Sequence, residues 1–302
     1  MFPGFTIKGG ANYNIDTRNN VYMNLGFLSK APRFSNVFNN DNKEVLDAKN
    51  EKIYALEVGY NFNIKAVSLN VNAYLTKWDN RPLDATPTFT DPKTQDTYPY
   101  NINGINALHK GIEIEFGWKP IPSLQWDQVL SWGDWRWASG GRAYVYTPTG
   151  ELIDSVDFNA KGVHVGDAAQ FQLMESLRWE IIKYLYVSGS VTLFAKNYSQ
   201  MDPASLSPQT NPNYLDENGD PRDSWELPVY YLVDVNAGYR FTFNKYKLDI
   251  RASVLNLLNR EYISDAQNND SYSTKTTNFD AGSAGVFFGV GRTFNASVAF
   301  SF

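Results

Sequence analysis

The residues best suited to chemistry in this 302-residue chain are tryptophans, tyrosines and arginines that gather near its middle. Aromatic rings that stack and guanidinium groups that donate paired hydrogen bonds suit the recognition of a small molecule at a concave surface. The densest run is Trp132–Trp137, in which Asp134 adds a hydrogen-bond acceptor. For any single ring, the alternative is a place in a membrane-interface girdle or in ordinary loop packing. The candidate ligand-binding residues are Trp78, Arg81, Asp134, Trp135, Arg136, Trp137, Arg142, Tyr144 and Tyr146.

Catalytic chemistry has little support in the sequence. The chain has no cysteine and only two histidines, His109 and His164, which excludes disulfides, thiolate metal sites and a cysteine nucleophile. A general base needs a positioned partner, and the pattern places His109 at the mouth of a strand without one. His164 lies in a long connection, where a single histidine is a weak metal site. We therefore expect no enzyme activity, no cofactor and no metal site.

An acidic segment, Asp216-Glu217-Asn218-Gly219-Asp220-Pro221, resembles the start of a calcium loop because oxygen-bearing side chains stand at alternate positions. Pro221 replaces the glycine that such a loop requires, and the closing glutamate is out of place. A turn is the favoured interpretation, and calcium binding is the alternative. The formal net charge of -5 gives no reason to expect nucleic acid as a partner.

Hydrophobic periodicity predicts the elements that position these residues. Apolar and polar side chains alternate along most of the chain, and a period of two predicts β-strands with one apolar face. No helix of useful length is predicted, and no run of about 18 apolar residues indicates a transmembrane helix. The eleven predicted strands contain the segments 5–15, 21–27, 54–62, 67–75, 112–118, 124–132, 171–179, 185–193, 231–241, 248–254 and 294–302.

The connections between these strands alternate strictly between short and long. Loops above about 12–15 residues are uncommon in compact domains, and here every long one falls at the same end of the predicted sheet. Short turns at one end and long loops at the other are typical of outer-membrane β-barrels. The short connections are 16–20, 63–66, 119–123, 182–184 and 242–245, and the long ones are 30–50, 79–108, 136–168, 199–228 and 257–286.

The two faces of the strands fit a membrane barrel with a wet interior. Charged side chains such as Glu113, Asp249 and Arg251 lie opposite the apolar faces, and an Arg or Lys exposed to lipid at the midplane would cost roughly 2–4 kcal/mol. Gln128 and Glu175 are exceptions that strict alternation places on the lipid face, unless a β-bulge turns either one inward. The alternative fold is a soluble β-sandwich or propeller, whose strands are shorter.

The last strand carries a pattern of its own. Its alternating apolar residues and terminal aromatic ring resemble the signal by which the outer-membrane assembly machinery recognises its clients. The alternative is a core strand that happens to be terminal. The predicted signal residues are Phe294, Val298, Phe300 and Phe302.

Several motifs together resemble one family, the TonB-dependent outer-membrane receptors. Residues 248–263 are similar to the family's penultimate strand and its Asn-Leu-Phe-Asn-Lys-x-Tyr-like end, although Leu258 stands where Phe is frequent and Arg260 where Lys is frequent. Gly291–Phe294 is similar to the Gly-Arg-x-Phe/Tyr start of the final strand. The resemblance rests on the order of the motifs across nearly the whole chain. The residues within these motifs suggest the Bacteroidetes branch of the family. The other similar segments are Ala31–Phe34, Asn50–Tyr60 and His109–Glu115.

The resemblance implies an all-β fold, a transmembrane antiparallel β-barrel of 22 strands closed by an N-terminal plug. Residues 1–302 would form its C-terminal eleven strands; no plug domain or signal peptide is recognisable, so we expect a fragment or half of a split receptor. The implied function is active uptake of a scarce nutrient, such as a siderophore, cobalamin, a glycan or a peptide, across the bacterial outer membrane. The implied partners are the lipid bilayer, the TonB–ExbB–ExbD system acting through the plug, and a surface lipoprotein. The alternatives are a passive porin-like channel and a secreted β-rich binding protein.

Overall fold

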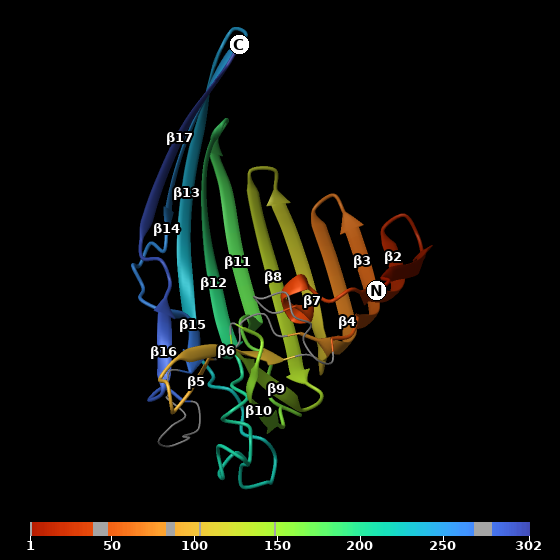
Figure 1. The fold of residues 1–302 in the computed structure, drawn as a ribbon. Helices are drawn as coiled ribbons and strands as arrows, with labels where there is room; N and C mark the ends of the chain where they lie inside the picture. Colours follow the sequence, from red (N-terminus) through yellow and green to blue (C-terminus); the bar gives the residue numbers. More distant parts are fainter. Residues whose placement is uncertain (1, 39–47, 83–87, 103, 148, 269–279) are drawn as a thin grey trace.

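The computed structural model describes residues 2–38, 48–82, 88–102, 104–147, 149–268 and 280–302. Within them, one antiparallel sheet of eleven strands forms a tall curved wall (Figure 1). The strand order follows the sequence, which confirms the predicted antiparallel sheet of eleven strands. The strands of the wall are β1 (Phe5–Asn14), β2 (Asn19–Lys30), β3 (Glu51–Ile64), β4 (Val67–Arg81), β7 (Ile105–Ile121), β8 (Leu124–Trp137), β11 (Ala169–Ile182), β12 (Leu185–Asn197), β13 (Tyr230–Phe243), β14 (Tyr246–Leu255) and β17 (Thr293–Ser301).

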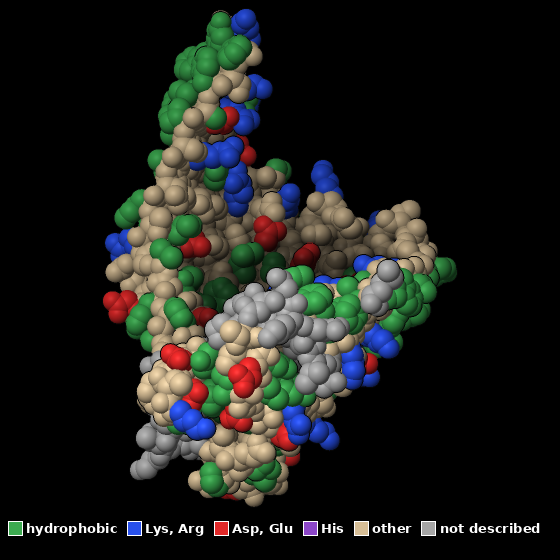
Figure 2. All heavy atoms as spheres, viewed as in Figure 1, with side chains coloured by type: hydrophobic (Ala, Val, Ile, Leu, Met, Phe, Trp, Pro, Cys, Tyr) green, Lys and Arg blue, Asp and Glu red, His purple; other side chains and the backbone are tan. Residues whose placement is uncertain are grey.

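The register places the apolar side chains of neighbouring strands side by side. Ile114 of β7 lies between Val71 of β4 and Leu130 of β8. These apolar rows face away from the protein, so that Leu177 is 50% exposed and Val298 is 68% exposed. The opposite, polar face lines the hollow that the curve of the wall encloses (Figure 2). A single layer of strands has nothing to bury its apolar face against except lipid.

The short connections lie together at one end of the wall (Figure 1), as predicted. Two of these turns pass through the left-handed region, at Tyr184 with a φ of 72° and at Asn244 with a φ of 54°, and asparagine adopts this region more readily than most residues. In the first turn, Oδ1 of Asp16 accepts hydrogen bonds from the backbone N–H groups of Arg18 (2.7 Å) and Asn19 (2.8 Å). Side chains that satisfy their own backbone favour such turns.

The long connections contain short strands that hydrophobic periodicity does not predict. These are β5 (Thr88–Thr90), β6 (Thr97–Ile102), β9 (Gly141–Tyr146) and β10 (Leu152–Phe158), which form a second sheet in the order β10-β9-β6-β5, and the pair β15 (Ile263–Asn268) and β16 (Ala284–Phe288). Strands of three to seven residues show too few alternations to be distinguished from loop. The helix α1 (Phe34–Val37) is a single turn. Among the described residues, no helix has both the length and the hydropathy needed to cross a membrane.

The buried hydrophobic cluster lies at the long-loop end and not in the wall. We call it the loop core. It joins the ends of β7 and β8 to the second sheet and to the connection after β12, and Trp137 within it is only 2% exposed. The loops therefore pack into a folded cap on that end of the concave face (Figure 1). The loop core consists of Ile102, Ile105, Ala107, Trp137, Ala143, Val145, Val156, Phe158, Ala160, Val163, Val165, Met201 and Leu206.

Gln128 and Glu175 stand opposite each other on the outward face, as strict alternation predicted. The β8–β11 ladder is continuous through both residues, so no bulge turns them inward. Trp126 Nε1 donates a 2.6 Å hydrogen bond to Glu175 Oε2, and the Gln128 amide donates to the other carboxylate oxygen. The polar atoms of this pair therefore satisfy one another on an otherwise apolar surface.

Candidate functional site

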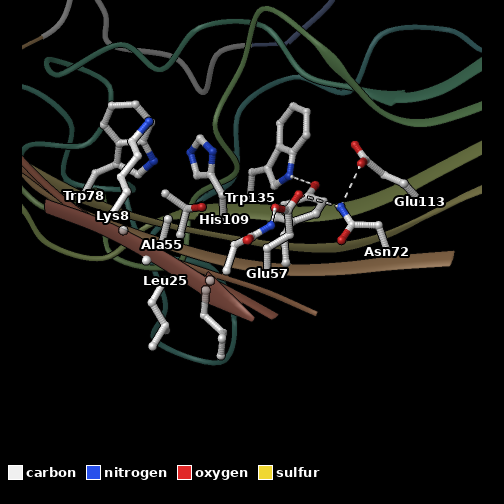
Figure 3. Close-up of a pocket in the computed structure, with 16 residues that line it drawn as sticks. Lys8, Leu25, Ala55, Glu57, Asn72, Trp78, His109, Glu113 and Trp135 are labelled. Atoms are coloured by element: carbon white, nitrogen blue, oxygen red, sulfur yellow. Dashed lines mark hydrogen bonds between the residues drawn. The ribbon is translucent and has the colours of Figure 1, made fainter. Parts of the chain in front are cut away.

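A hollow of about 810 Å³ lies on the concave face, on strands β1 to β4, β7 and β8. Its side chains come from the polar positions of these strands, because alternate residues of a strand point to opposite faces. Figure 3 shows Glu57, Asn72, Glu113 and the rings above them on one side of the sheet, while Leu25 points away on the other. The hollow is lined chiefly by Lys8, Asn24, Glu57, Asn72, Tyr74, Thr76, Trp78, His109, Glu113 and Trp135.

The floor of the hollow is a polar network centred on Asn72. The Asn72 side-chain amide donates to Glu57 Oε1 (3.0 Å) and to Glu113 Oε2 (3.3 Å). Tyr22 donates to Asn72 Oδ1 (3.3 Å), and Asn24 donates to Glu57 Oε2 (3.1 Å). A carboxylate accepts at about four lone-pair sites, so Glu57 and Glu113 keep acceptor capacity for a bound molecule.

Aromatic rings form the side of the hollow nearest the loop core. The His109 ring lies between Trp78, at 5.9 Å between ring centroids, and Trp135, at 5.4 Å and nearly parallel. Trp135 Nε1 donates a 2.8 Å hydrogen bond to the Tyr74 hydroxyl. Among the described residues, the buried atoms Trp78 Nε1 and His109 Nε2 have no hydrogen-bond partner. Buried polar atoms are normally paired, so these two atoms are exceptions on this side of the hollow.

Two glycines let these rings lie against the sheet. Gly111 and Gly133 are cross-strand partners on β7 and β8. A Cβ at Gly111 would lie 2.5 Å from the Tyr74 hydroxyl, and one at Gly133 would lie 2.5 Å from Trp135 Nε1. Glycine is therefore required for close approach of the rings to the backbone.

The structure separates the predicted ligand residues of the run 132–137. Trp135 lines the hollow with Trp78, whereas Trp137 is buried in the loop core. The Arg81 guanidinium lies 5.3 Å from the ring centroids of both Trp78 and Trp137 and so connects the two regions. Asp134 and Arg136 lie on the outward face, where their side chains form a 2.7 Å ion pair.

The remaining predicted residues lie on the second sheet, away from the hollow. Arg142 of β9 binds Asp157 of β10 through two hydrogen bonds of 2.6 and 2.7 Å. This bond holds the pKa of the exposed Asp157 carboxyl below its ordinary value. The rings of Tyr144 and Tyr146 stack at 6.2 Å on the face of β9 opposite the loop core.

His164, which the sequence left without a partner, connects three parts of the long-loop end. Its backbone N–H and its Nδ1 contact the Asp223 carboxylate at 2.8 and 2.5 Å. Its ring stacks on Tyr198 at 4.0 Å, and burial raises the pKa of the Tyr198 phenol to about 12. Its Nε2 lies 3.8 Å from Asp134. These contacts give His164 a role in fastening loops together.

The segment Asp216–Pro221 forms a tight turn. Asp216 Oδ1 accepts hydrogen bonds from the N–H groups of Asn218 (2.8 Å) and Asp220 (3.0 Å), and Gly219 has a φ of +82°. Within the described residues, no group of three or more His, Asp or Glu side chains is placed to hold a metal ion.

Several residues of the hollow were not among the predicted ligand residues. The sequence identified Glu113 as a polar-face residue and His109 as a strand-end histidine, without joining them into one site. The spacing of two residues along β4 could have identified part of the site from the sequence, because it places Tyr74, Thr76 and Trp78 on one face of the strand. Lys8 and Glu57 could be added only once the strand register was known.

The fold and the hollow together define a class of protein. An antiparallel wall with an apolar outward face, long loops at one end and a polar interior is typical of outer-membrane transport proteins. The chain belongs to the TonB dependent receptor-like, beta-barrel family, whose model matches residues 2–257. It is therefore an outer-membrane protein, and the family resemblance carried by the motifs is confirmed. The Bacteroidetes assignment stays a prediction.

Solved structures share the fold of the chain. The ferric yersiniabactin uptake receptor FyuA from Yersinia pestis is 19% identical, with a TM-score of 0.60 over 98% of this chain and 37% of that one. The siderophore receptor PiuA from Acinetobacter baumannii is 13% identical, with a TM-score of 0.62 over 96% of this chain and 35% of that one. The copper transporter OprC is 16% identical, with a TM-score of 0.62 over 97% of this chain and 38% of that one.

These structures are more than twice as long as the chain, which spans only 37% of FyuA. No curated protein matches the sequence.

Proposed function

We propose that this chain forms part of the barrel wall of a receptor that takes up a scarce nutrient actively across the outer membrane. The observation that carries the proposal is the hollow of about 810 Å³, in which aromatic rings, carboxylates and amides converge on the concave face. Clefts of this size, with a few polar groups fixed among apolar ones, are typical of small-molecule sites.

The proposed cargo is a siderophore, cobalamin, a glycan or a peptide. FyuA, PiuA and OprC are described as handling ferric yersiniabactin, siderophores and copper respectively, which supports small and scarce cargo. Within the hollow, Glu57 and Glu113 outnumber Lys8, so acceptors of hydrogen bonds predominate. A ligand surface rich in N–H or O–H donors would complement this floor.

The proposed receptor is completed by parts outside these eleven strands. A closed barrel of 22 strands, with a plug that contacts the TonB–ExbB–ExbD system, would account for the greater length of the solved structures. The outward exposure of Phe294, Val298 and Phe300 on β17 supports recognition of that strand, with Phe302, by the outer-membrane assembly machinery. A surface lipoprotein over the long-loop end is a further proposed partner.

Uptake measurements test the proposal. Cells that express the full receptor would be given a panel of radiolabelled ferric siderophores, cobalamin, oligosaccharides and peptides, with and without TonB. Active transport predicts accumulation of one panel member that is lost without TonB. Accumulation that persists without TonB would instead indicate that the protein is a passive channel.

Two tryptophans of β8 provide a matched pair for the site. Trp135→Ala removes a ring from the hollow, whereas Trp132→Ala removes a ring from the outward face. We expect the first variant to weaken binding of the transported ligand about tenfold, as the loss of one buried contact of about 1.4 kcal/mol would. The second should bind normally. Equal effects of the two variants on ligand binding would contradict the assignment of the hollow as the binding site.

A further inference from the structure

Each of the five short connections of the wall carries one basic side chain, and all five side chains are exposed. Four of them lie between two strands, and Lys119 lies two residues before the end of β7. Figure 2 shows Lys and Arg side chains along this end of the wall. We call this set the turn row. It consists of Arg18, Lys65, Lys119, Lys183 and Lys245.

Hydrogen bonds between neighbouring hairpins hold the turn row in a fixed order. The Asn63 N–H donates to the Arg18 carbonyl at 2.8 Å, and the Lys119 N–H donates to the Ala66 carbonyl at 2.8 Å. Successive short turns lie two strands apart in the sheet, which is about 10 Å at the usual strand spacing. The turn row is therefore a line of positive charges at regular intervals along one end of the wall.

The charges of the turn row are not neutralised within the wall. In the described part of the chain, no side chain of the turn row forms an ion pair. The carboxylates nearest to it in sequence serve their own turns. Asp16 accepts hydrogen bonds from the backbone of its turn, and Glu180 accepts one from the Tyr184 N–H at 2.9 Å. The turn row therefore presents a positive field to an anion from outside the chain.

Aromatic rings mark the height of the turn row in the membrane. Lys183 Nζ lies 4.9 Å from the ring centroid of Tyr184, and Lys245 Nζ lies 5.3 Å from that of Tyr246. Trp118, the last outward ring of β7, is 41% exposed. Trp and Tyr gather where the hydrocarbon meets the lipid headgroups, and lysine extends its ammonium from there toward water. Because short turns face the periplasm, the turn row lies level with the headgroups of the periplasmic leaflet.

We propose that the turn row binds the phosphates of anionic phospholipids in the periplasmic leaflet and so fixes the height of the wall in the membrane. One phosphate for each cation fits the spacing of about 10 Å. Lysine and arginine hold phosphate through charge-assisted hydrogen bonds. The acyl chains of the same lipids lie against outward side chains such as Trp126 and Leu177, which are cross-strand partners.

The shortness of the turns favours a lipid as the partner. Four of the five connections have only two residues between their strands, so their cations cannot extend far into the periplasm. A soluble anion would gain only the charge attraction, which salt screens for exposed groups. A lipid adds the burial of its chains against the same wall.

The test compares double variants of the full receptor that remove equal charge. One turn variant combines Lys65→Gln with Lys119→Gln, and the other combines Lys183→Gln with Lys245→Gln. The control combines Lys93→Gln with Lys161→Gln, two exposed positions in the long connections at the opposite end. Each protein is placed in nanodiscs of phosphatidylglycerol and phosphatidylcholine with identical acyl chains, and bound lipid is counted by native mass spectrometry. Heat-modified gel migration identifies the variants that are folded.

The native receptor should retain phosphatidylglycerol at least tenfold better than phosphatidylcholine, because each cation near an anionic surface strengthens binding by about fivefold. Each turn variant should lower this preference at least threefold, and the control should leave it unchanged. A smaller drop in a folded turn variant would overturn the proposal. An equal drop in the control would also overturn it, because net charge would then be the cause. Complete displacement of the lipid by millimolar inorganic phosphate would do the same, because the turn row would then recognise the free anion.

Discussion

At the residue scale, the aromatic side of the hollow depends on the missing side chain at Gly111. A Cβ there would lie 2.5 Å from the Tyr74 hydroxyl and 2.6 Å from the Trp132 carbonyl oxygen, which is fixed in the sheet. Gly111→Ala should therefore destabilise the folded barrel by about 1–3 kcal/mol, measured by urea titration of tryptophan fluorescence. Gly26→Ala is the control, because its Cβ would meet only side-chain atoms at 3.8 Å. Equal stability of the two variants would contradict this account of the rings.

The Arg142–Asp157 pair makes a prediction about pH. The Arg142 hydrogen bond lowers the pKa of Asp157 in the folded chain, so the charged carboxylate stabilises the β9–β10 pairing. That stabilisation is present above the unfolded pKa of about 3.9, and it is lost as the pH falls through the lower folded pKa. A ¹³C titration of the carboxyl should show a midpoint below 3.9 in the native chain. Arg142→Gln should raise the midpoint of the Asp157 titration. Identical midpoints in the native chain and the variant would show that Arg142 does not lower the pKa of Asp157.

At the scale of elements, Trp137 joins the wall to the second sheet. Its side chain is 2% exposed within the loop core, and Trp→Ala changes at such sites cost about 3–5 kcal/mol. Trp137→Ala should expose β9 and β10 to limited proteolysis while β11 and β12 stay protected. Tyr144→Ala on the opposite face of β9 should leave the cleavage pattern unchanged. Cleavage of the wall strands at the same rate would show that the cap and the wall unfold together.

The wall could be predicted from the sequence because its strands are long. β7 alternates over most of its length, and that pattern determines which face each residue occupies. The small strands β5, β6, β9 and β10 could not be predicted, since their pairing depends on contacts between separate loops. The run 132–137 does not form one cluster, because alternation along β8 places Trp135 on the face opposite Asp134 and Arg136. The floor around Asn72 required the register, which brings β2, β3, β4 and β7 together.

At the scale of the whole molecule, the wall has two edges, β1 and β17. Unpaired strand edges are not tolerated in a hydrocarbon environment. The proposed closed barrel resolves this, because further strands would pair with both edges. In this closed barrel the wall would have a lipid-facing outside and a ligand-contacting inside, with a cap of packed loops at one end.

The most direct test of this account is a nitroxide scan of four consecutive positions on β7. The chain has no cysteine, so single cysteines at Ile112, Glu113, Ile114 and Glu115 can be labelled cleanly in the full receptor in liposomes. Labels at 112 and 114 should collide with oxygen dissolved in the lipid, and labels at 113 and 115 should collide with a water-soluble nickel chelate or be shielded from both reagents. Oxygen accessibility at 113 and 115 that equals that at 112 and 114 would contradict the assignment of an outward lipid face and an inward site.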